Sequence, residues 1–218
     1  MRLHPEKPQL GFRASQPNQT WHIDVTILKL LDGTKAHTHA AIDNYSRKIL
    51  AWSIADKFSP TNTCQIIIEA GSHLETPTSA DVFMDSVLEN LNGRVDSLFD
   101  NGVLQRVLAQ IDIRYSNSMI ETGFRALKHN CLFLHQLNDA VTAKRLVEFY
   151  VREHNTAIRS SAFGGERPNE IYFRTGAHVR HEVMAIRLKA KPTRVQRNRS
   201  ACGACPRPQP RARSDRAT

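Results

Sequence analysis

Cysteine and long apolar runs are both scarce in this sequence. Only four cysteines occur in 218 residues, which is too few for the disulfide framework of a small secreted domain. No apolar segment approaches the roughly 20 residues that cross a bilayer, and residues 1–12 contain no apolar signal core. The sequence therefore predicts an intracellular globular protein without a membrane span. The lone Cys202-x-x-Cys205 pair lacks the second ligand pair of a zinc site, so it predicts no bound metal.

Positive charge is concentrated at one end of the chain. The formal net charge is +9. Residues 187–218 contain ten lysines and arginines and one acid, Asp215, whereas the other 186 residues contain 20 basic and 20 acidic residues. Basic arms of this kind commonly contact nucleic acid through its phosphates, without sequence specificity. A disordered, solubilising tail explains the same composition.

The first half of the chain has the pattern of strands interrupted by helices. Residues 20–55 predict three antiparallel strands, with Asp32-Gly33 as a hairpin turn. His37 and His39 alternate along the second of these strands and are predicted to lie on the surface. The sequence then predicts a helix, a short buried strand, a second helix and a fifth strand, over residues 60–75, 80–84, 91–108 and 109–115.

The second half is helical. Amphipathic spacing predicts helices over residues 118–134, 139–155, 167–176 and 178–191. The whole order predicts an α/β fold, with a mixed five-stranded sheet flanked by helices. Its parts would be an N-terminal arm or linker at 1–19, a core domain at 20–176 and a basic tail at 177–218 that is helical and then disordered.

Three acids stand where an α/β fold can bring side chains together. Asp24 lies inside the first predicted strand, where an unpaired charge is costly to bury. Asp85 follows the strand at 80–84, and α/β folds bind ligands at strand ends. Glu121 begins the helix that starts at Ser118. Each acid also has a simpler explanation: a solvent-facing strand position, a turn or N-cap, and a capping box with Ser118, respectively.

Together, these acids and the segments around them resemble the DDE transposases and retroviral-type integrases. The 35 residues between Asp85 and Glu121 are about the interval found in that family. Seven segments of this chain resemble matching blocks of bacterial insertion-sequence transposases. They are WHIDVT, AIDNYSRKILAW, DSVLEN, SNSMIE, LKH, RLVEFYVREHN and RPNEIYF. The resemblance covers roughly residues 10–176. It implies an RNase H-like catalytic core in a cytoplasmic, nucleoid-associated bacterial protein. The aspartate of AIDNYSR, Asp43, is interpreted as a turn residue that bonds nearby backbone.

The resemblance implies that Asp24, Asp85 and Glu121 hold two divalent cations, Mg²⁺ or Mn²⁺, since hard cations prefer oxygen ligands. Asp24 would bridge both ions, Asp85 would complete one and Glu121 the other, with the ions about 4 Å apart. Water would cut a phosphodiester at the end of a mobile element, and the freed 3′-hydroxyl would attack target DNA. The implied partners are element ends, target DNA and further copies of the chain assembled on the DNA.

Polar side chains near Glu121 extend the implied site. Lys128 follows Glu121 by seven residues and therefore lies on the same helix face, with Arg125 between them. In the family the matching lysine contacts DNA, and the resemblance carries that role to Lys128. An ordinary ion pair on a solvated face explains Arg125 equally well. Ser116 and Asn117 are further candidates for contacts with the DNA backbone.

Some features depart from the family pattern. Val87 stands where related sequences usually carry glycine, and Arg159-Ser160 replaces a common Pro-His pair. The sequence shows no helix-turn-helix region ahead of the core, which predicts a truncated reading frame or a separate DNA-recognition protein. Two alternatives to a catalytic core follow: a catalytically impaired DNA-binding remnant, and a structure-specific nuclease on the same fold.

Overall fold

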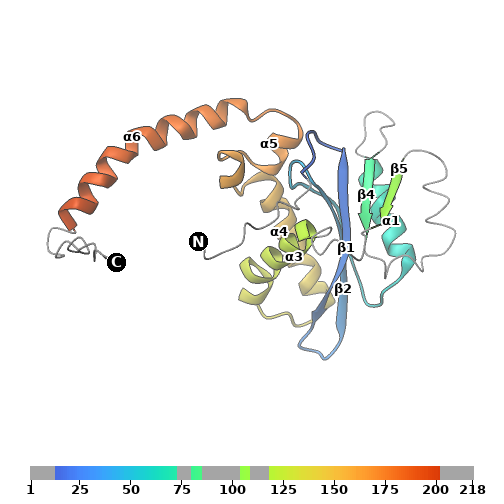
Figure 1. Cartoon of the computed structure of the whole chain (residues 1–218). Helices are drawn as coiled ribbons and strands as arrows, with labels where there is room; N and C mark the ends of the chain where they lie inside the picture. Colours follow the sequence, from blue (N-terminus) through green and yellow to red (C-terminus); the bar gives the residue numbers. More distant parts are fainter. Residues whose placement is uncertain (1–12, 73–79, 85–103, 109–117, 202–218) are drawn as a thin grey trace, which may run out of the picture.

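The fold is built on a mixed sheet. The computed structural model describes residues 13–72, 80–84, 104–108 and 118–201. The sheet has the spatial order β3-β2-β1-β4-β5, and its strands are β1 (Thr20–Lys29), β2 (Lys35–Asp43), β3 (Ile49–Ala55), β4 (Ala80–Met84) and β5 (Leu104–Leu108). The first three form an antiparallel meander, and β4 and β5 run parallel to β1. The mixed α/β sheet flanked by helices is therefore confirmed (Figure 1).

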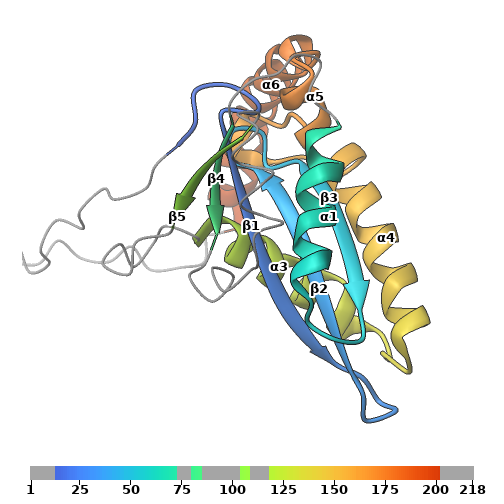
Figure 2. The ribbon, with the colours of Figure 1, turned by 90° about the vertical axis from the view of Figure 1, so that its right-hand side faces the viewer.

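Helices cover both faces of this sheet. The helix α1 (Pro60–Gly71) lies across one face, as Figure 2 shows, whereas α3 (Ser118–Asn130) and α4 (Ala140–Thr156) lie on the other. The remaining helical segments are η2 (Leu132–Leu134), η3 (Ser161–Phe163), α5 (Pro168–Tyr172) and α6 (Ala177–Ala201). Ser59 caps α1 by accepting a hydrogen bond from the Thr61 amide, and Asp139 does the same for α4 at Thr142.

The alternation of side chains along β1 divides the core into two layers. Trp21 and Ile23 are fully buried and pack in the cluster that contains Ile66 of α1. Leu28 belongs to the opposite cluster, with Ile120 and Phe124 of α3 among its members. Successive strand residues point to opposite faces. The even-numbered residues of this part of β1 therefore face α3 and α4.

One predicted helix is wrong at its end. The sequence predicts a helix over residues 91–108, with Gly102 as a possible stop, but residues 104–108 form β5. The ladder that β5 makes with β4, from Ala80↔Leu104 onward, overrides that local pattern. The fifth strand predicted at 109–115 lies outside the described residues.

The C-terminal helix is longer than the sequence predicted. The expected helix ends near residue 191, but α6 continues through Pro192 to Ala201, over 25 residues. Proline removes one backbone hydrogen bond and bends a helix without necessarily ending it, and α6 follows a curved course away from the core (Figure 1). Residues 202–218, with Cys202 and Cys205, lie outside the described part of the chain.

Residues 14–19, predicted as part of an N-terminal arm, contact the core. Ala14 is buried, and its amide donates to Oδ1 of Asn44 at 2.7 Å. The Asn18 amide donates to Asp43 at 2.8 Å, and the Asn18 side chain accepts from the Tyr172 hydroxyl at 2.9 Å. This short segment therefore ties the start of β1 to the β2–β3 turn and to α5.

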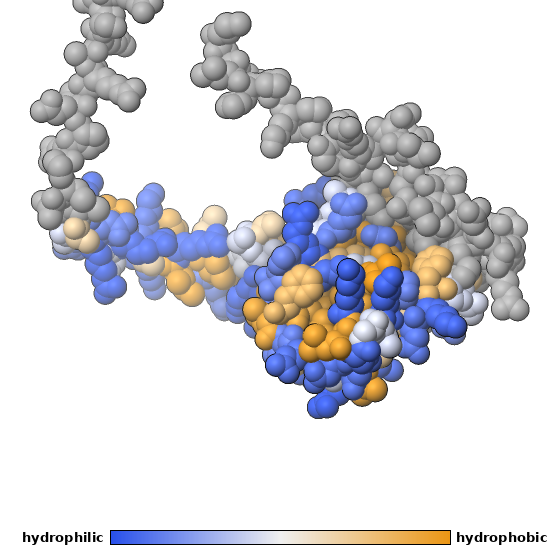
Figure 3. Space-filling model, turned by 90° about the horizontal axis from the view of Figure 1, so that it is seen from below, coloured by the Kyte–Doolittle hydropathy of each residue, from blue (hydrophilic) through white to orange (hydrophobic). Residues whose placement is uncertain are grey.

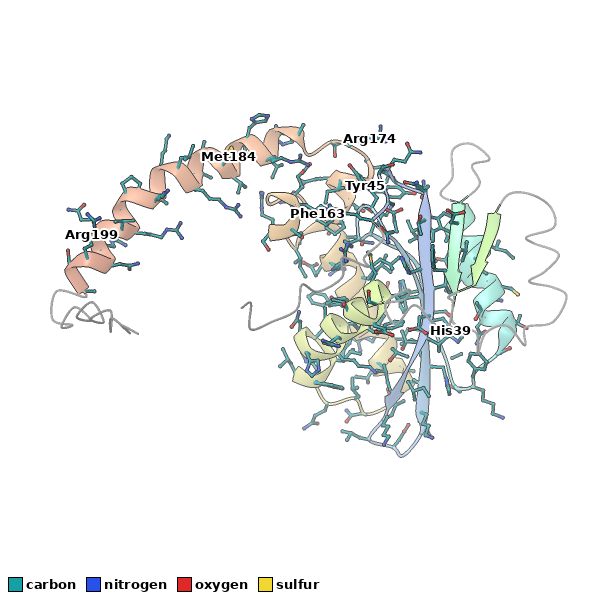
Figure 4. The ribbon with its side chains drawn as sticks, viewed as in Figure 1. His39, Tyr45, Phe163, Arg174, Met184 and Arg199 are labelled. Carbon is teal, nitrogen blue, oxygen red and sulfur yellow. The ribbon has the colours of Figure 1, made fainter. Side chains whose placement is uncertain are left out.

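The prediction that His39 lies on the surface is wrong. His39 of β2 has no exposed surface and stacks on Phe58, with ring centroids 5.9 Å apart. Its Nδ1 lies 3.4 Å from the Thr63 hydroxyl. Figure 4 shows His39 within the sheet. Burial, with a smaller contribution from His37, lowers the pKa of His39 to about 4.

This buried histidine predicts a loss of stability in mild acid. An unfolded histidine has a pKa near 6.5, so the unfolded chain binds more protons than the folded chain between pH 6.5 and about 4. The free energy of unfolding should therefore fall over that interval, by up to roughly 3 kcal/mol. Urea titrations should show a much shallower fall in His39→Gln. The comparison variant His37→Gln should show a fall only slightly smaller than that of the wild type, because His37 makes the smaller contribution to the pKa shift. Equal slopes in all three proteins would contradict this account.

A glycine in α3 offers a second stability test. Gly123 lines an apolar cavity of about 30 Å³ between the sheet, α3 and α4. A Cβ there would meet the Ile42 Cδ1 at 3.7 Å, an ordinary contact. Alanine is favoured over glycine in helix interiors, so Gly123→Ala should stabilise the fold by about 0.5–1 kcal/mol in urea unfolding. The matched control is Gly176→Ala, whose Cβ would lie 2.6 Å from Oε1 of Glu166, and it should destabilise the fold.

Candidate functional site

Asp24 lies on the face of the sheet that α3 covers. It is half-buried in β1 and pairs with Ala40 of β2, a member of the cluster beneath α3. Its Oδ1 accepts a hydrogen bond from the Val25 amide at 2.7 Å. The neighbouring Ile23 points into the α1 cluster. The strand therefore holds the Asp24 carboxylate against the α3 layer of the protein, not at a fully solvated edge.

Asp85 lies outside the described residues, but the strand that precedes it is described. The parallel ladder between β1 and β4 runs from Thr20↔Asp81 to Ile23↔Met84. Ile23 directly precedes Asp24, and Met84 directly precedes Asp85. The last described pair of this ladder therefore stands immediately before both predicted acids.

Glu121 lies in the first turn of α3, on the Asp24 side of the sheet, and its side chain is exposed. Ile120 and Phe124 anchor the helix by packing into the core. Ser118 is itself helical in α3, so it is not the N-cap residue that the capping box requires. The two residues before it, Ser116 and Asn117, lie outside the described part of the chain.

Lys128 is the basic group that α3 brings close to Asp24. Partial burial lowers the pKa of the Lys128 ammonium, and the negative charge of Asp24 acts in the opposite direction. The two groups therefore interact electrostatically between α3 and β1. Arg125, one turn earlier, is exposed. The described site thus contains one half-buried carboxylate, one exposed carboxylate and one partly buried ammonium.

The residues present fit a hard divalent cation in their chemistry. Asp24 and Glu121 offer carboxylate oxygens, the ligands that Mg²⁺ prefers, and no thiolate is among the candidates. Within residues 13–72, 80–84, 104–108 and 118–201, no group of three His, Cys, Asp or Glu side chains converges. Asp85, the third expected ligand, is not in those ranges.

A buried polar cluster holds the start of β1 in place. Asp43 has no exposed surface, and its carboxylate accepts from the Ser46 amide and hydroxyl at 2.7 and 2.6 Å, as well as from Asn18. This confirms its interpretation as a turn residue. Burial raises the pKa of Asp43, while these hydrogen bonds and the charge of Lys48 oppose the shift. Lys48 lies over the Tyr172 ring at 4.1 Å.

His22 is a buried polar residue near Asp24 that the sequence analysis did not single out. It is buried in β1 two residues before Asp24, on the same face by strand alternation. Its Nε2 lies 2.8 Å from Nδ2 of Asn44, and its ring stacks on Phe83 of β4 at 5.2 Å. Only its place in the segment WHIDVT hinted at a role. This contact links β1, β4 and the β2–β3 turn.

Two departures from the family pattern have different outcomes. Val87 lies outside the described residues. At the other departure, the Ser160 amide donates to the Glu166 carbonyl at 3.1 Å, and Nη1 of Arg159 donates to the Gly165 carbonyl at 3.3 Å. These residues therefore serve to close the turn around η3. Cys64 and Cys131 are both buried free thiols.

A family model and two curated proteins relate this chain to integrases and transposases. Residues 14–118 match the family model of the integrase core domain. The chain is 23% identical over 160 residues to the transposase InsF for insertion sequence IS3A of Escherichia coli K12, which covers 73% of this chain and 55% of that protein. It is 20% identical over 166 residues to the putative transposase InsK for insertion sequence element IS150 from the same strain. This match covers 76% of this chain and 58% of that protein. The chain thus spans little more than half the length of these curated relatives.

Solved structures share the fold at low sequence identity. The HTLV-2 integrase catalytic core domain in complex with magnesium matches with a TM-score of 0.58 and 19% identity, covering 73% of this chain and 99% of that chain. A chain from the cryo-EM structure of the simian T-cell lymphotropic virus intasome in complex with PP2A regulatory subunit B56 gamma matches with a TM-score of 0.63 and 14% identity. The match covers 74% of this chain and 56% of that chain. Among the described residues, no helix is long and apolar enough to span a membrane.

The family-model match spans the residues that form all five strands of the described sheet, from β1 to β5. The family-model match over residues 14–118, the transposase relatives and the shared fold show that this chain is similar to insertion-sequence transposases with an integrase-like core.

Proposed function

We propose that this chain is the catalytic core of a DDE-type DNA transposase, which cuts a phosphodiester at the end of a mobile element and joins the new 3′ end to target DNA. One observation carries the proposal: the β1–β4 ladder reaches Ile23↔Met84, and Asp24 and Asp85 are the residues that follow this pair in the sequence. Neighbouring strands lie about 4.8 Å apart. Continuation of the ladder by one residue would therefore bring these carboxylates within reach of one cation.

Glu121 completes the proposed ligand set from α3, the helix that covers the Asp24 face of the sheet. Its helix packs on the face to which Asp24 points, and its exposed carboxylate is free of the apolar layer formed by Ile120 and Phe124. Asp24, Asp85 and Glu121 would hold two Mg²⁺ or Mn²⁺ ions. When bound, these ions would supply the positive charge that stabilises both the attacking and the leaving oxygen of an in-line displacement.

Lys128 is proposed to bind the DNA strand beside this site. Burial disfavours the charged form of the Lys128 ammonium, whereas the negative charge of Asp24 favours that charged form. An ammonium on the site's border can donate to a phosphate oxygen of the strand that is cut and hold it in line with the carboxylates. Arg125, Asn117 and Ser116 are proposed to contact the same strand. DNA ends and target DNA are the proposed substrates, with several copies of the chain assembled on them.

The first functional prediction concerns the carboxylates. Asp24→Asn and Glu121→Gln should each lower Mg²⁺-dependent nicking and strand transfer by about 10²–10³-fold, comparable with the loss of one preorganised electrostatic group. The control Asp56→Asn removes an exposed carboxylate after β3 and should keep full activity. Thermal unfolding should confirm that all three variants fold. Wild-type activity in Asp24→Asn would show that this carboxylate is not part of the active site.

The second functional prediction separates Lys128 from Arg125. Lys128→Gln should weaken binding of the DNA that carries the cleavage site by about 10-fold or more, because it removes a hydrogen bond to a charged phosphate. Arg125→Gln removes the same charge from an exposed position on α3 and should have a smaller effect. Affinities can be measured in Ca²⁺, which binds oxygen ligands. Equal losses in both variants would argue against a special role for Lys128.

A further inference from the structure

Most of the C-terminal helix α6 is in contact with solvent, and its composition is unbalanced. Between Ala177 and Ala201 it carries seven lysines and arginines and a single acid, Glu182. Nearly every residue after Val183 is exposed. In Figure 3 the helix extends from the core as a mostly hydrophilic rod. A helix with so little packing of its own gains little stability from the protein core, which favours an external binding partner.

The cations of α6 are not spread evenly around its axis. Arg187, Lys191 and Arg194 follow one another at intervals of four and three residues, which places them in one row. Arg180 and Met184 lie on the same side of the helix, two turns and one turn before Arg187, respectively. Figure 4 shows Met184 on the middle part of the helix. We call Arg187, Lys191 and Arg194 the basic row. It borders a groove of about 410 Å³ between α6 and Gly164.

A buried acid, Glu166, holds the start of α6 and so orients the basic row. Glu166 is only 4% exposed and accepts hydrogen bonds from Nε and Nη2 of Arg180. The charge of Arg180 is therefore neutralised by Glu166. For this reason Arg180 is not counted in the basic row, whose first residue is Arg187.

Two glycines, Gly164 and Gly165, allow the start of α6 to pack closely against the turn after η3. A Cβ on Gly164 would lie 2.9 Å from Cγ of Arg180, and one on Gly165 would lie 2.9 Å from Cγ2 of Val183. Both glycines have positive φ, 70° and 101°, which other residues rarely adopt. The start of α6 is therefore held against the η3 turn at a defined angle.

We propose that the basic row of α6 is a docking surface for the phosphate backbone of duplex DNA, positioned by the ion pair between Arg180 and Glu166. This inference rests on the proposed function, since it names a second contact for the same substrate. Charge complementarity selects the partner. The row extends over about 10 Å of helix, and one strand of B-form DNA presents about three phosphates over that length.

The binding experiment compares two triple variants of equal charge. One replaces the basic row (Arg187→Gln, Lys191→Gln, Arg194→Gln). The control replaces three cations elsewhere around the same helix (Lys189→Gln, Arg197→Gln, Arg199→Gln). Affinity for a duplex oligonucleotide is measured by fluorescence anisotropy at several salt concentrations. The basic-row triple should bind at least about 10-fold more weakly near 0.1 M salt. The slope of log K against log salt should fall by about 2.7, at about 0.9 per phosphate contact. The control should change the slope by less than about 1.

Equal losses in both triples, or no loss in the basic-row triple, would overturn the proposal. So would a change in the sedimentation mass of the DNA-free protein in the basic-row triple alone, because that result would assign the face to a second copy of the chain. Metal-dependent cleavage distinguishes the two proposals. Row-dependent binding without any cleavage by the wild type would refute the proposed function and leave the docking surface standing. Normal cleavage with unchanged binding in the basic-row triple would refute the docking surface alone.

Discussion

The pairing of β1 on both of its edges is the constraint on which the rest of the structure depends. Its antiparallel ladder with β2 places Asp24 opposite Ala40, and its parallel ladder with β4 places Ile23 beside Met84. A slip of one residue in either ladder would turn Asp24 toward the α1 cluster and Trp21 or Ile23 toward α3. Because both faces of the sheet are covered, such a slip would bury a carboxylate among apolar side chains. The register is therefore fixed by the same burial that forms the core.

The buried polar groups at the top of the sheet support this register. The carboxylate of Asp43 is satisfied by three donors, and His22 contacts both Asn44 and Phe83. On the other side, the Asn155 side chain of α4 accepts from the Ile49 amide and donates to the Ile49 carbonyl, at 3.0 and 2.9 Å. Such groups are costly to bury unless they are paired. They therefore specify one arrangement of the turn, of β1 and of α4, which together position the face that holds Asp24.

Much of this arrangement follows from local pattern. The meander, α1, β4 and the starts of α3 and α4 were predicted from apolar spacing and turn residues, and alternation along β1 was enough to separate Asp24 from Ile23. The failures have tertiary causes. Residues 104–108 have helical spacing but pair with β4, and His39 is buried because Phe58 and Thr63 cover it. The helix predicted to end near residue 191 continues to Ala201. The partnership of Glu166 with Arg180 joins residues 14 apart across a turn, which no periodicity reveals.

The central claim is that Asp24 and Glu121 belong to one divalent-metal site together with Asp85. The most direct measurement is a crystal structure of the wild-type protein grown with Mn²⁺, with anomalous diffraction used to locate the ion. The account predicts a peak bridged by the carboxylates of Asp24 and Asp85 or of Asp24 and Glu121, with oxygen ligands at about 2.0–2.3 Å, as hard divalent cations require. A structure in which Mn²⁺ binds elsewhere, and in which Asp24 pairs only with Lys128 while Glu121 points to solvent, would contradict it.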